Sequence, residues 1–207
     1  WVESHKSQPE LVYGNTQFAY NYLSDTYKNQ VDWDLNNILI VTVDIEVQCE
    51  NGFPSAKEAE EEMLSITIKN HQSKRIVVFG LHEFTTNRDD VTYIHCESEV
   101  HLLKEFLVFW EKHHPDIVTG WNTEFFDIPY ICGRIEKTLG EDAIRKLSPF
   151  NNVYAGTRNN SFGQKELFYV IKGISQLDYL ALYKKFTFVN RETYKLDFIA
   201  EVELGDR

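Results

Sequence analysis

Three carboxylates in this sequence have neighbours that suggest chemistry. Asp44 and Glu46 interrupt an otherwise apolar run, and Asp127 stands immediately before Ile128 and Pro129. Residues two apart on a strand point to the same face, so Asp44 and Glu46 would project together. Two adjacent like charges are costly to bury unless a cation neutralises them, and carboxylate oxygens suit Mg²⁺ or Mn²⁺. The spacing therefore predicts a divalent-metal site.

Each carboxylate also has an ordinary structural interpretation. Asp44 and Glu46 could lie in water at the edge of a sheet. Asp127 is well placed as a helix N-cap, with Pro129 tolerated in the first turn. Taken alone, capping is the more common role for such an Asp. Together with D-I-E about eighty residues earlier, Asp127 is better explained by a shared acidic site at a strand-to-helix junction.

The elements that would position these residues follow from the hydrophobic pattern. A strand is predicted at residues 38–47 (ILIVTVDIEV), buried on both faces, and strands at 64–69 and 75–81 continue it as a meander. A helix from Ser98 to before Pro115, a strand at 116–119, a turn at Gly120 and a helix from Asp127 to Leu139 are expected next. Strand, helix, strand and helix in this order imply parallel pairing and an α/β layered fold.

The remaining segments carry weaker signals. Residues 151–172 are predicted as a hairpin with arms at 153–155 and 166–171, and residues 177–186 and 194–202 as helices. The acidic stretch at 58–62 is interpreted as a solvated face or a helical turn. The first 35 residues are polar, aromatic-rich and weakly periodic, and look like part of a preceding domain or a docking segment. We therefore expect one main domain over residues 36–207.

The composition excludes several classes of protein. No apolar run approaches the roughly 20 residues that span a bilayer, and the first ten residues lack the features of a signal peptide, so we expect a cytoplasmic protein. Three widely spaced cysteines, Cys49, Cys96 and Cys132, suggest neither a disulfide framework nor a zinc site. They are predicted to be buried free thiols.

The charge is unevenly distributed along the chain. The net charge of −11 argues against nucleic acid, but residues 133–195 hold eleven Lys/Arg and six Asp/Glu, a balance of +5 that leaves −16 for the rest. An acidic body with a basic flank can hold metal on one side and guide a polyanion on the other. Scattered solvated charges are the alternative.

The motifs resemble those of a known family. D-I-E at 44–46 resembles the first exonuclease motif of family B DNA polymerases, and N-x-x-x-F-D at 122–127 is similar to the second. GFP after DIEV, TGWN-x-E-x-FDIPY, RKLSP, GIS-x-LDY and LYKKF also resemble the polymerases of large tailed bacteriophages. The likeness runs from about Phe18 to Leu204. The sequence thus resembles the 3′ to 5′ proofreading exonuclease domain of such a polymerase.

The resemblance implies a ribonuclease H-like mixed sheet flanked by helices, with an inserted β-hairpin. It also implies two Mg²⁺ or Mn²⁺ ions held by four carboxylates, of which Asp44, Glu46 and Asp127 match three as catalytic residues and metal ligands. The fourth belongs to a Tyr-x-x-x-Asp motif further along, and no such motif follows Asp127 in this sequence. Asp178 and Asp197 do not fit it. We therefore expect a truncated domain whose activity is severely impaired.

The resemblance also suggests contacts with substrate. Phe53 matches an aromatic residue that wedges against the terminal bases, although a packed core or loop Phe is the alternative. Asn122 matches an Asn near the 3′ terminal nucleotide, and a turn-stabilising Asn is its alternative. The 151–172 hairpin matches one that separates the primer end from its template, with an ordinary surface hairpin as the alternative.

The expected partners follow from the same resemblance. They are single-stranded DNA 3′ ends, primer-template DNA, the rest of a polymerase chain and, through the full-length protein, a sliding clamp. No membrane partner is expected. The alternatives are a non-catalytic DNA-end-binding or interaction module and a free-standing exonuclease of the same fold.

Overall fold

The structure, a computed structural model, describes residues 5, 18–28, 32–50, 52–159 and 165–205. The chain divides into two compact units, Trp1–Leu35 and Asn36–Arg207. The first unit contains helix α2 (Phe18–Thr26), and a short 3-10 helix, η1 (Leu35–Asn37), lies at the boundary. Of the expected docking segment, residues 1–4, 6–17 and 29–31 lie outside the described residues.

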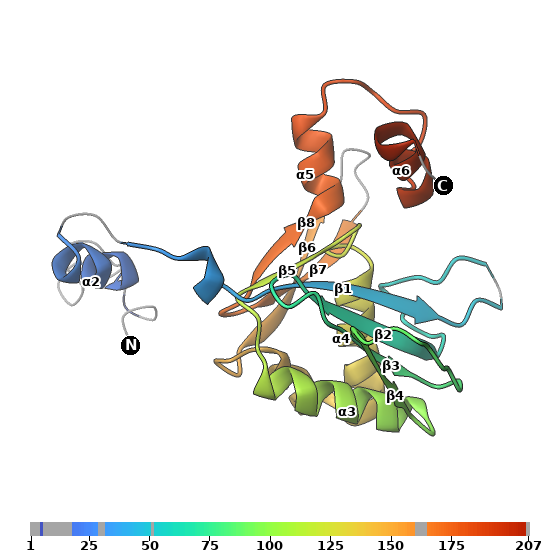
Figure 1. The fold of residues 1–207 in the computed structure, drawn as a ribbon. Coiled ribbons are helices and arrows are strands. Elements are labelled where there is room, and N and C mark those ends of the chain that lie inside the picture. Colours follow the sequence, from blue (N-terminus) through green and yellow to red (C-terminus); the bar gives the residue numbers. More distant parts are fainter. Residues whose placement is uncertain (1–4, 6–17, 29–31, 51, 160–164, 206–207) are drawn as a thin grey trace. The chain divides into compact units, whose positions relative to one another are not determined.

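The second unit is built around a mixed sheet (Figure 1). Within the described ranges this sheet has six strands, in the order β4-β3-β2-β1-β5-β8. The strands are β1 (Ile40–Val47), β2 (Met63–Asn70), β3 (Ile76–Gly80), β4 (Val91–His95), β5 (Ile117–Gly120) and β8 (Ser175–Asp178). β1 pairs antiparallel with β2 and parallel with β5, as the order of elements predicted. β5 in turn pairs parallel with β8.

The core lies between this sheet and two helices, α3 (Glu99–Lys112) and α4 (Asp127–Leu139). Alternate residues of β1 are buried, and they join apolar side chains of α3 and α4 in one cluster that includes Val43, Ile66, Leu103, Phe106 and Ile131. Ser98 caps α3 as predicted, since its side chain accepts a hydrogen bond from the His101 N–H. The predicted α/β fold with a ribonuclease H-like mixed sheet is confirmed.

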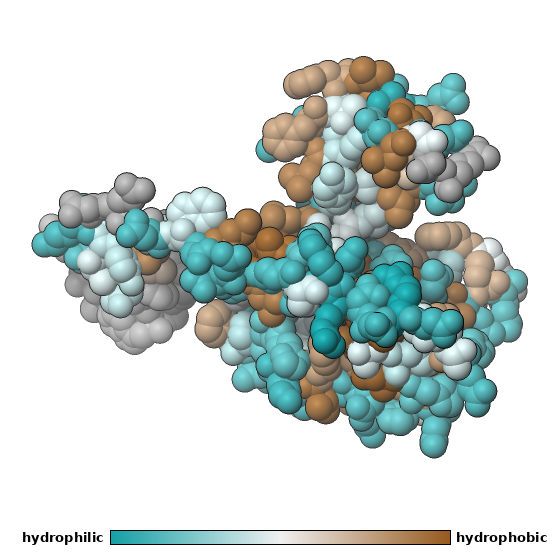
Figure 2. Space-filling model, viewed as in Figure 1, coloured by the Kyte–Doolittle hydropathy of each residue, from teal (hydrophilic) through white to brown (hydrophobic). Residues whose placement is uncertain are grey.

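The segments after α4 complete the second unit. A 3-10 helix, η2 (Glu141–Leu147), leads to the predicted hairpin, which is a separate two-stranded sheet of β6 (Val153–Asn159) and β7 (Lys165–Ile171). Most of the predicted hairpin tip, residues 160–164, lies outside the described residues. Helices α5 (Tyr179–Phe186) and α6 (Leu196–Leu204) follow β8. Apolar side chains gather over α5 and α6 at the top of Figure 2.

Three local predictions were wrong. β4 was not predicted, and residues 177–178, assigned to a helix, belong to strand β8. Cys49 is exposed, whereas Cys96 and Cys132 are buried as expected.

None of the helices in the described part of the chain is long and apolar enough to cross a membrane.

Candidate active site

Asp44 and Glu46 lie on the same face of β1, as their spacing predicted. Val43 and Ile45, which alternate with them, are buried, whereas both carboxylates are exposed. A register shift between Glu46 and Val47 marks a β-bulge immediately after them. Bulges of this kind re-aim side chains and are common beside active sites.

Asp127 opens α4, and its side chain is only 4% exposed. Its Oδ1 accepts a hydrogen bond of 3.2 Å from the Ile45 N–H, across 82 residues of sequence. The pairing of β1 with β5 ends at Thr42, so this N–H, further along β1, finds its acceptor in Asp127 instead. The N-cap position of α4 is Phe126, which makes no side-chain cap. Asp127 therefore reaches the backbone between Asp44 and Glu46 rather than capping its own helix.

The charge of Asp44 acts on the buried carboxyl of Asp127. Burial and the nearby charge of Asp44 raise the pKa of Asp127 from its ordinary value of 3.8 to about 7, and Asp178 adds a smaller effect in the same direction. Burial also raises the pKa of Asp44. Desolvation and like-charge repulsion both disfavour ionisation, and a cation bound beside these groups would relieve both.

The carboxylates of Asp44, Glu46 and Asp127 are chemically suited to a hard divalent cation, because such ions prefer carboxylate oxygens as ligands. Among the residues that the structure describes, however, no three His, Cys, Asp or Glu side chains are gathered closely enough to hold a metal ion. The charge of Asp44 contributes to the raised pKa of Asp127, and Glu46 lies on the same face of β1 as Asp44. The assignment of all three as catalytic metal ligands stays a prediction.

Phe53 and Asn122 lie on the two loops that flank these carboxylates. The Phe53 side chain is 84% exposed, which rules out a core position, and its ring centroid lies 5.1 Å from that of Phe126. Asn122 has a φ of +64°, in the left-handed region that Asn tolerates better than most residues. Its carbonyl accepts hydrogen bonds from the Phe125 and Phe126 N–H groups, so Asn122 does form a turn.

A cleft of about 520 Å³ opens beside Asn122. It lies between the residue 121–126 loop, the hairpin and α5, and its lining includes Asn122, Phe125, Arg158, Glu166, Asp178 and Lys184. Arg158 of β6 donates hydrogen bonds of 3.0 and 3.4 Å to the Glu124 carboxylate, and its guanidinium lies 4.2 Å from the centroid of the Phe125 ring. The hairpin is therefore attached to the loop that leads to Asp127.

Asp178 is a residue of this region whose role was not predicted. It ends β8, is 5% exposed, and accepts hydrogen bonds from backbone N–H groups of both α5 and the 121–126 loop. The sequence did contain one signal, an Asp at the second position of the predicted helix 177–186, and Asp near a helix start is typical of an N-cap. The contact with the loop has no such signal, because its donors lie more than fifty residues away.

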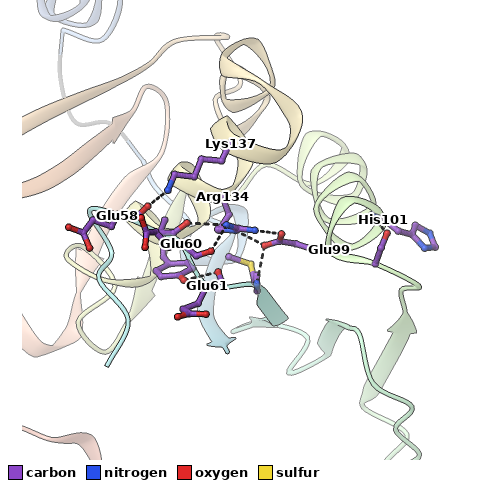
Figure 3. A network of polar contacts seen from close by, with 11 residues as sticks. Glu58, Glu60, Glu61, Glu99, His101, Arg134 and Lys137 are labelled. Atoms are coloured by element: carbon purple, nitrogen blue, oxygen red, sulfur yellow. Dashed lines mark hydrogen bonds and ion pairs between the residues drawn. The ribbon is translucent and has the colours of Figure 1, made fainter. Parts of the chain in front are cut away.

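A second polar network fixes the chain between β1 and β2 (Figure 3). Arg134 of α4 donates to both oxygens of the buried Glu99 carboxylate and to the carbonyls of Ala59 and Glu60. Lys137 donates to the Glu58 carbonyl. The acidic stretch is therefore held through its main chain, while the side chains at 58, 60 and 62 are exposed, which agrees with its interpretation as a solvated face.

The chain is similar to a known family of proteins. The family model described as "DNA polymerase family B, exonuclease domain" matches residues 2–199. The chain is 34% identical to the DNA-directed DNA polymerases of Escherichia phage RB69 and Enterobacteria phage T4, with 99% and 98% of its length aligned. It is 28% identical to the DNA polymerase catalytic subunit of Human herpesvirus 7, over 92% of its length.

The matched proteins are much longer than this chain. The alignments cover 25% of each phage polymerase and 19% of the herpesvirus subunit. The chain thus spans about a quarter of the length of the phage polymerases that it resembles.

Proposed function

The chain belongs to the exonuclease domain family of family B DNA polymerases, and from this membership we propose that it is the 3′ to 5′ proofreading domain of a replicative polymerase. Its substrate is a single-stranded 3′ end of DNA, and its reaction is hydrolysis of the terminal phosphodiester. The observation that supports this proposal best is the contact of Asp127 with the backbone between Asp44 and Glu46.

We assign metal binding to Asp44, Glu46 and Asp127. Exonuclease domains of this family use divalent metals, and we propose two Mg²⁺ or Mn²⁺ ions for the complete site. When bound, such ions stabilise the negative charge that develops on a reacting phosphate. The chain's own contribution is to hold Asp127 in a desolvated position, where the charge of Asp44 makes it harder still to ionise without a cation.

We assign substrate binding to Phe53 and Asn122. Phe53 offers an exposed ring on which a base can stack, and Asn122 lines the cleft beside Asp127's loop. Arg158 and Lys184 give this cleft two cations suited to a phosphate backbone. To the hairpin, which is attached through Arg158 to Glu124, we assign the separation of a primer end from its template.

The partners that we propose are primer-template DNA, the rest of a polymerase chain and, through the full-length protein, a sliding clamp. The 207 residues contain three of the four carboxylates that the resemblance implies. We therefore expect the isolated chain to turn over far more slowly than an intact proofreading polymerase.

The test is hydrolysis of a 5′-labelled single-stranded oligonucleotide by the full-length protein that carries this chain. Products should shorten one nucleotide at a time from the 3′ end, only with Mg²⁺ or Mn²⁺ present, and Asp44→Ala should abolish them. Asp197→Ala is the matched control, because Asp197 is an exposed carboxylate on α6. Undiminished hydrolysis by Asp44→Ala would contradict the proposal.

The alternative is a non-catalytic module that binds DNA ends. Calorimetric titration of the 207-residue chain with Mn²⁺ separates the two. An interaction module would show the same heat with Asp44→Ala as with the wild type, whereas the proposed site would lose its carboxylate-dependent binding.

A further inference from the structure

The carboxylate of Asp178 joins two segments that are distant in sequence. Its Oδ1 accepts hydrogen bonds from the N–H groups of Leu180 and Ala181 in α5, at 2.8 and 3.2 Å. The same oxygen accepts from the Asn122 N–H at 3.3 Å, and Oδ2 accepts from the Glu124 N–H at 3.0 Å. Capping α5 needs only the first two of these bonds, so the other two serve the 121–126 loop.

The sheet brings Asp178 to this loop. Gly120, the last residue of β5, is the register partner of Asp178 in the parallel β5–β8 pair. The chain leaving β5 therefore passes directly over the Asp178 side chain before it enters α4 at Asp127. A buried carboxylate at the end of one strand is thus in reach of the backbone that leaves its neighbour.

The loop needs an external contact of this kind. Asn122 has a φ of +64°, and a non-glycine residue keeps such a conformation only where its surroundings fix it. Within the loop, the Asn122 carbonyl is satisfied by Phe125 and Phe126. The N–H groups of Asn122 and Glu124 point instead to Asp178.

We propose that Asp178 is a positioning residue of the exonuclease site, which fixes the 121–126 loop and through it the places of Asn122 and Asp127. This inference rests on the function proposed above. Asp178 is among the residues that line the cleft, but both of its carboxylate oxygens are occupied by backbone donors. Its loss should slow the reaction more than it weakens the binding of DNA, because displacement of a reacting group by about 1 Å can cost about 100-fold in rate.

Asp178→Asn is the most selective test, because it replaces the single acceptor of the Glu124 N–H while Oδ1 can still accept from α5. In the cation-free protein, hydrogen exchange followed by NMR should become about 10- to 100-fold faster at the Glu124 amide, as expected for a lost bond to a charged acceptor. The amides of Leu180 and Ala181 should change little. Asp197→Asn, on α6, should change none of them.

Asp178→Ser provides a second variant if the Asn side chain disturbs folding. Ser is a good N-cap and should keep α5 protected, but its single short hydroxyl cannot also reach the loop. Exchange should then rise at both Asn122 and Glu124. Unchanged exchange at Glu124 in both variants would overturn the proposal.

The kinetic arm uses the full-length protein on single-stranded DNA. For Asp178→Asn we expect kcat to fall about 10- to 100-fold with KM changed less than about threefold. Faster exchange with an unchanged kcat would show a purely structural residue and would overturn the positioning role. Full activity of Asp44→Ala would instead overturn the proposed function, so the two failures are distinguishable.

Discussion

Replacing Asp127 by Asn is expected to stabilise the cation-free protein at neutral and alkaline pH. The side chain is buried and its pKa is raised from 3.8 to about 7 by burial and by the charge of Asp44. A difference of about three pH units, at about 1.4 kcal/mol each, means that ionised Asp127 lowers the free energy of unfolding by up to about 4 kcal/mol. Asn removes this charge, and its Oδ1 can still accept from the Ile45 N–H.

The sign of the pH dependence follows from the direction of the shift. The folded protein holds the Asp127 proton more tightly than the unfolded chain, so the contribution of this group to stability is complete below pH 3.8. It is lost as the pH rises through about 7. The advantage of Asp127→Asn should therefore be near zero at pH 4 and reach its maximum, up to about 4 kcal/mol, above pH 7.

Urea unfolding of both proteins in chelator, at intervals from pH 4 to 8, measures this difference directly. Asp197→Asn, at an exposed position, serves as the control and should stay within about 0.5 kcal/mol of wild type at every pH. Saturating Mn²⁺ should reverse the order, because ligand binding stabilises only the protein that retains the site. Equal stability at pH 8, or an advantage that does not shrink toward pH 4, would refute the reasoning.

Three further changes test other parts of the structure. Arg134→Met should lower the free energy of unfolding in urea by about 3–5 kcal/mol, because it leaves the Glu99 carboxylate buried and unpaired; a loss below 1 kcal/mol would show that Glu99 is readily resolvated. Gly120→Ala should lower the Tm, at a cost of about 1–3 kcal/mol, because its Cβ would lie 2.7 Å from the Val43 carbonyl oxygen, and an unchanged Tm would contradict that packing. Phe53→Ala should leave the Tm unchanged, since the ring is exposed, yet weaken the binding of single-stranded DNA by about 1–3 kcal/mol in fluorescence anisotropy; unchanged affinity would favour a loop-packing role.

The sequence predicted those helices and strands whose own residues have a clear hydrophobic pattern or a recognisable cap. β1 has a dense run of β-branched residues, and α3 has a Ser cap followed by apolar residues at helical spacing, so both were found within two residues of their bounds. β4 was missed because its residues are half-buried or exposed at the sheet edge. β8 was missed because Ser175–Asp178 is short and polar, and only its pairing with β5 makes it a strand.

The candidate site was predicted in part, for a similar reason. The shared face of Asp44 and Glu46 follows from the two-residue repeat of a strand. The approach of Asp127 to Ile45 depends on a tertiary contact across 82 residues; the predicted strand-to-helix junction and the resemblance to known motifs suggested a shared site, but not this contact. The role proposed for Asp178 depends on two N–H donors of the distant 121–126 loop, which no local pattern encodes.

The network around Arg134 has a consequence for mutational tolerance. At positions 58, 60 and 61 it engages only carbonyl oxygens, from Arg134, Lys137 and Tyr130. Substitution at these three positions would alter surface charge and leave the anchoring intact. Ala59 differs, since it is buried with a φ of +41° and lies against Gly133. A library randomised over 58–61 should therefore accept almost any residue at three sites and only small ones at the fourth.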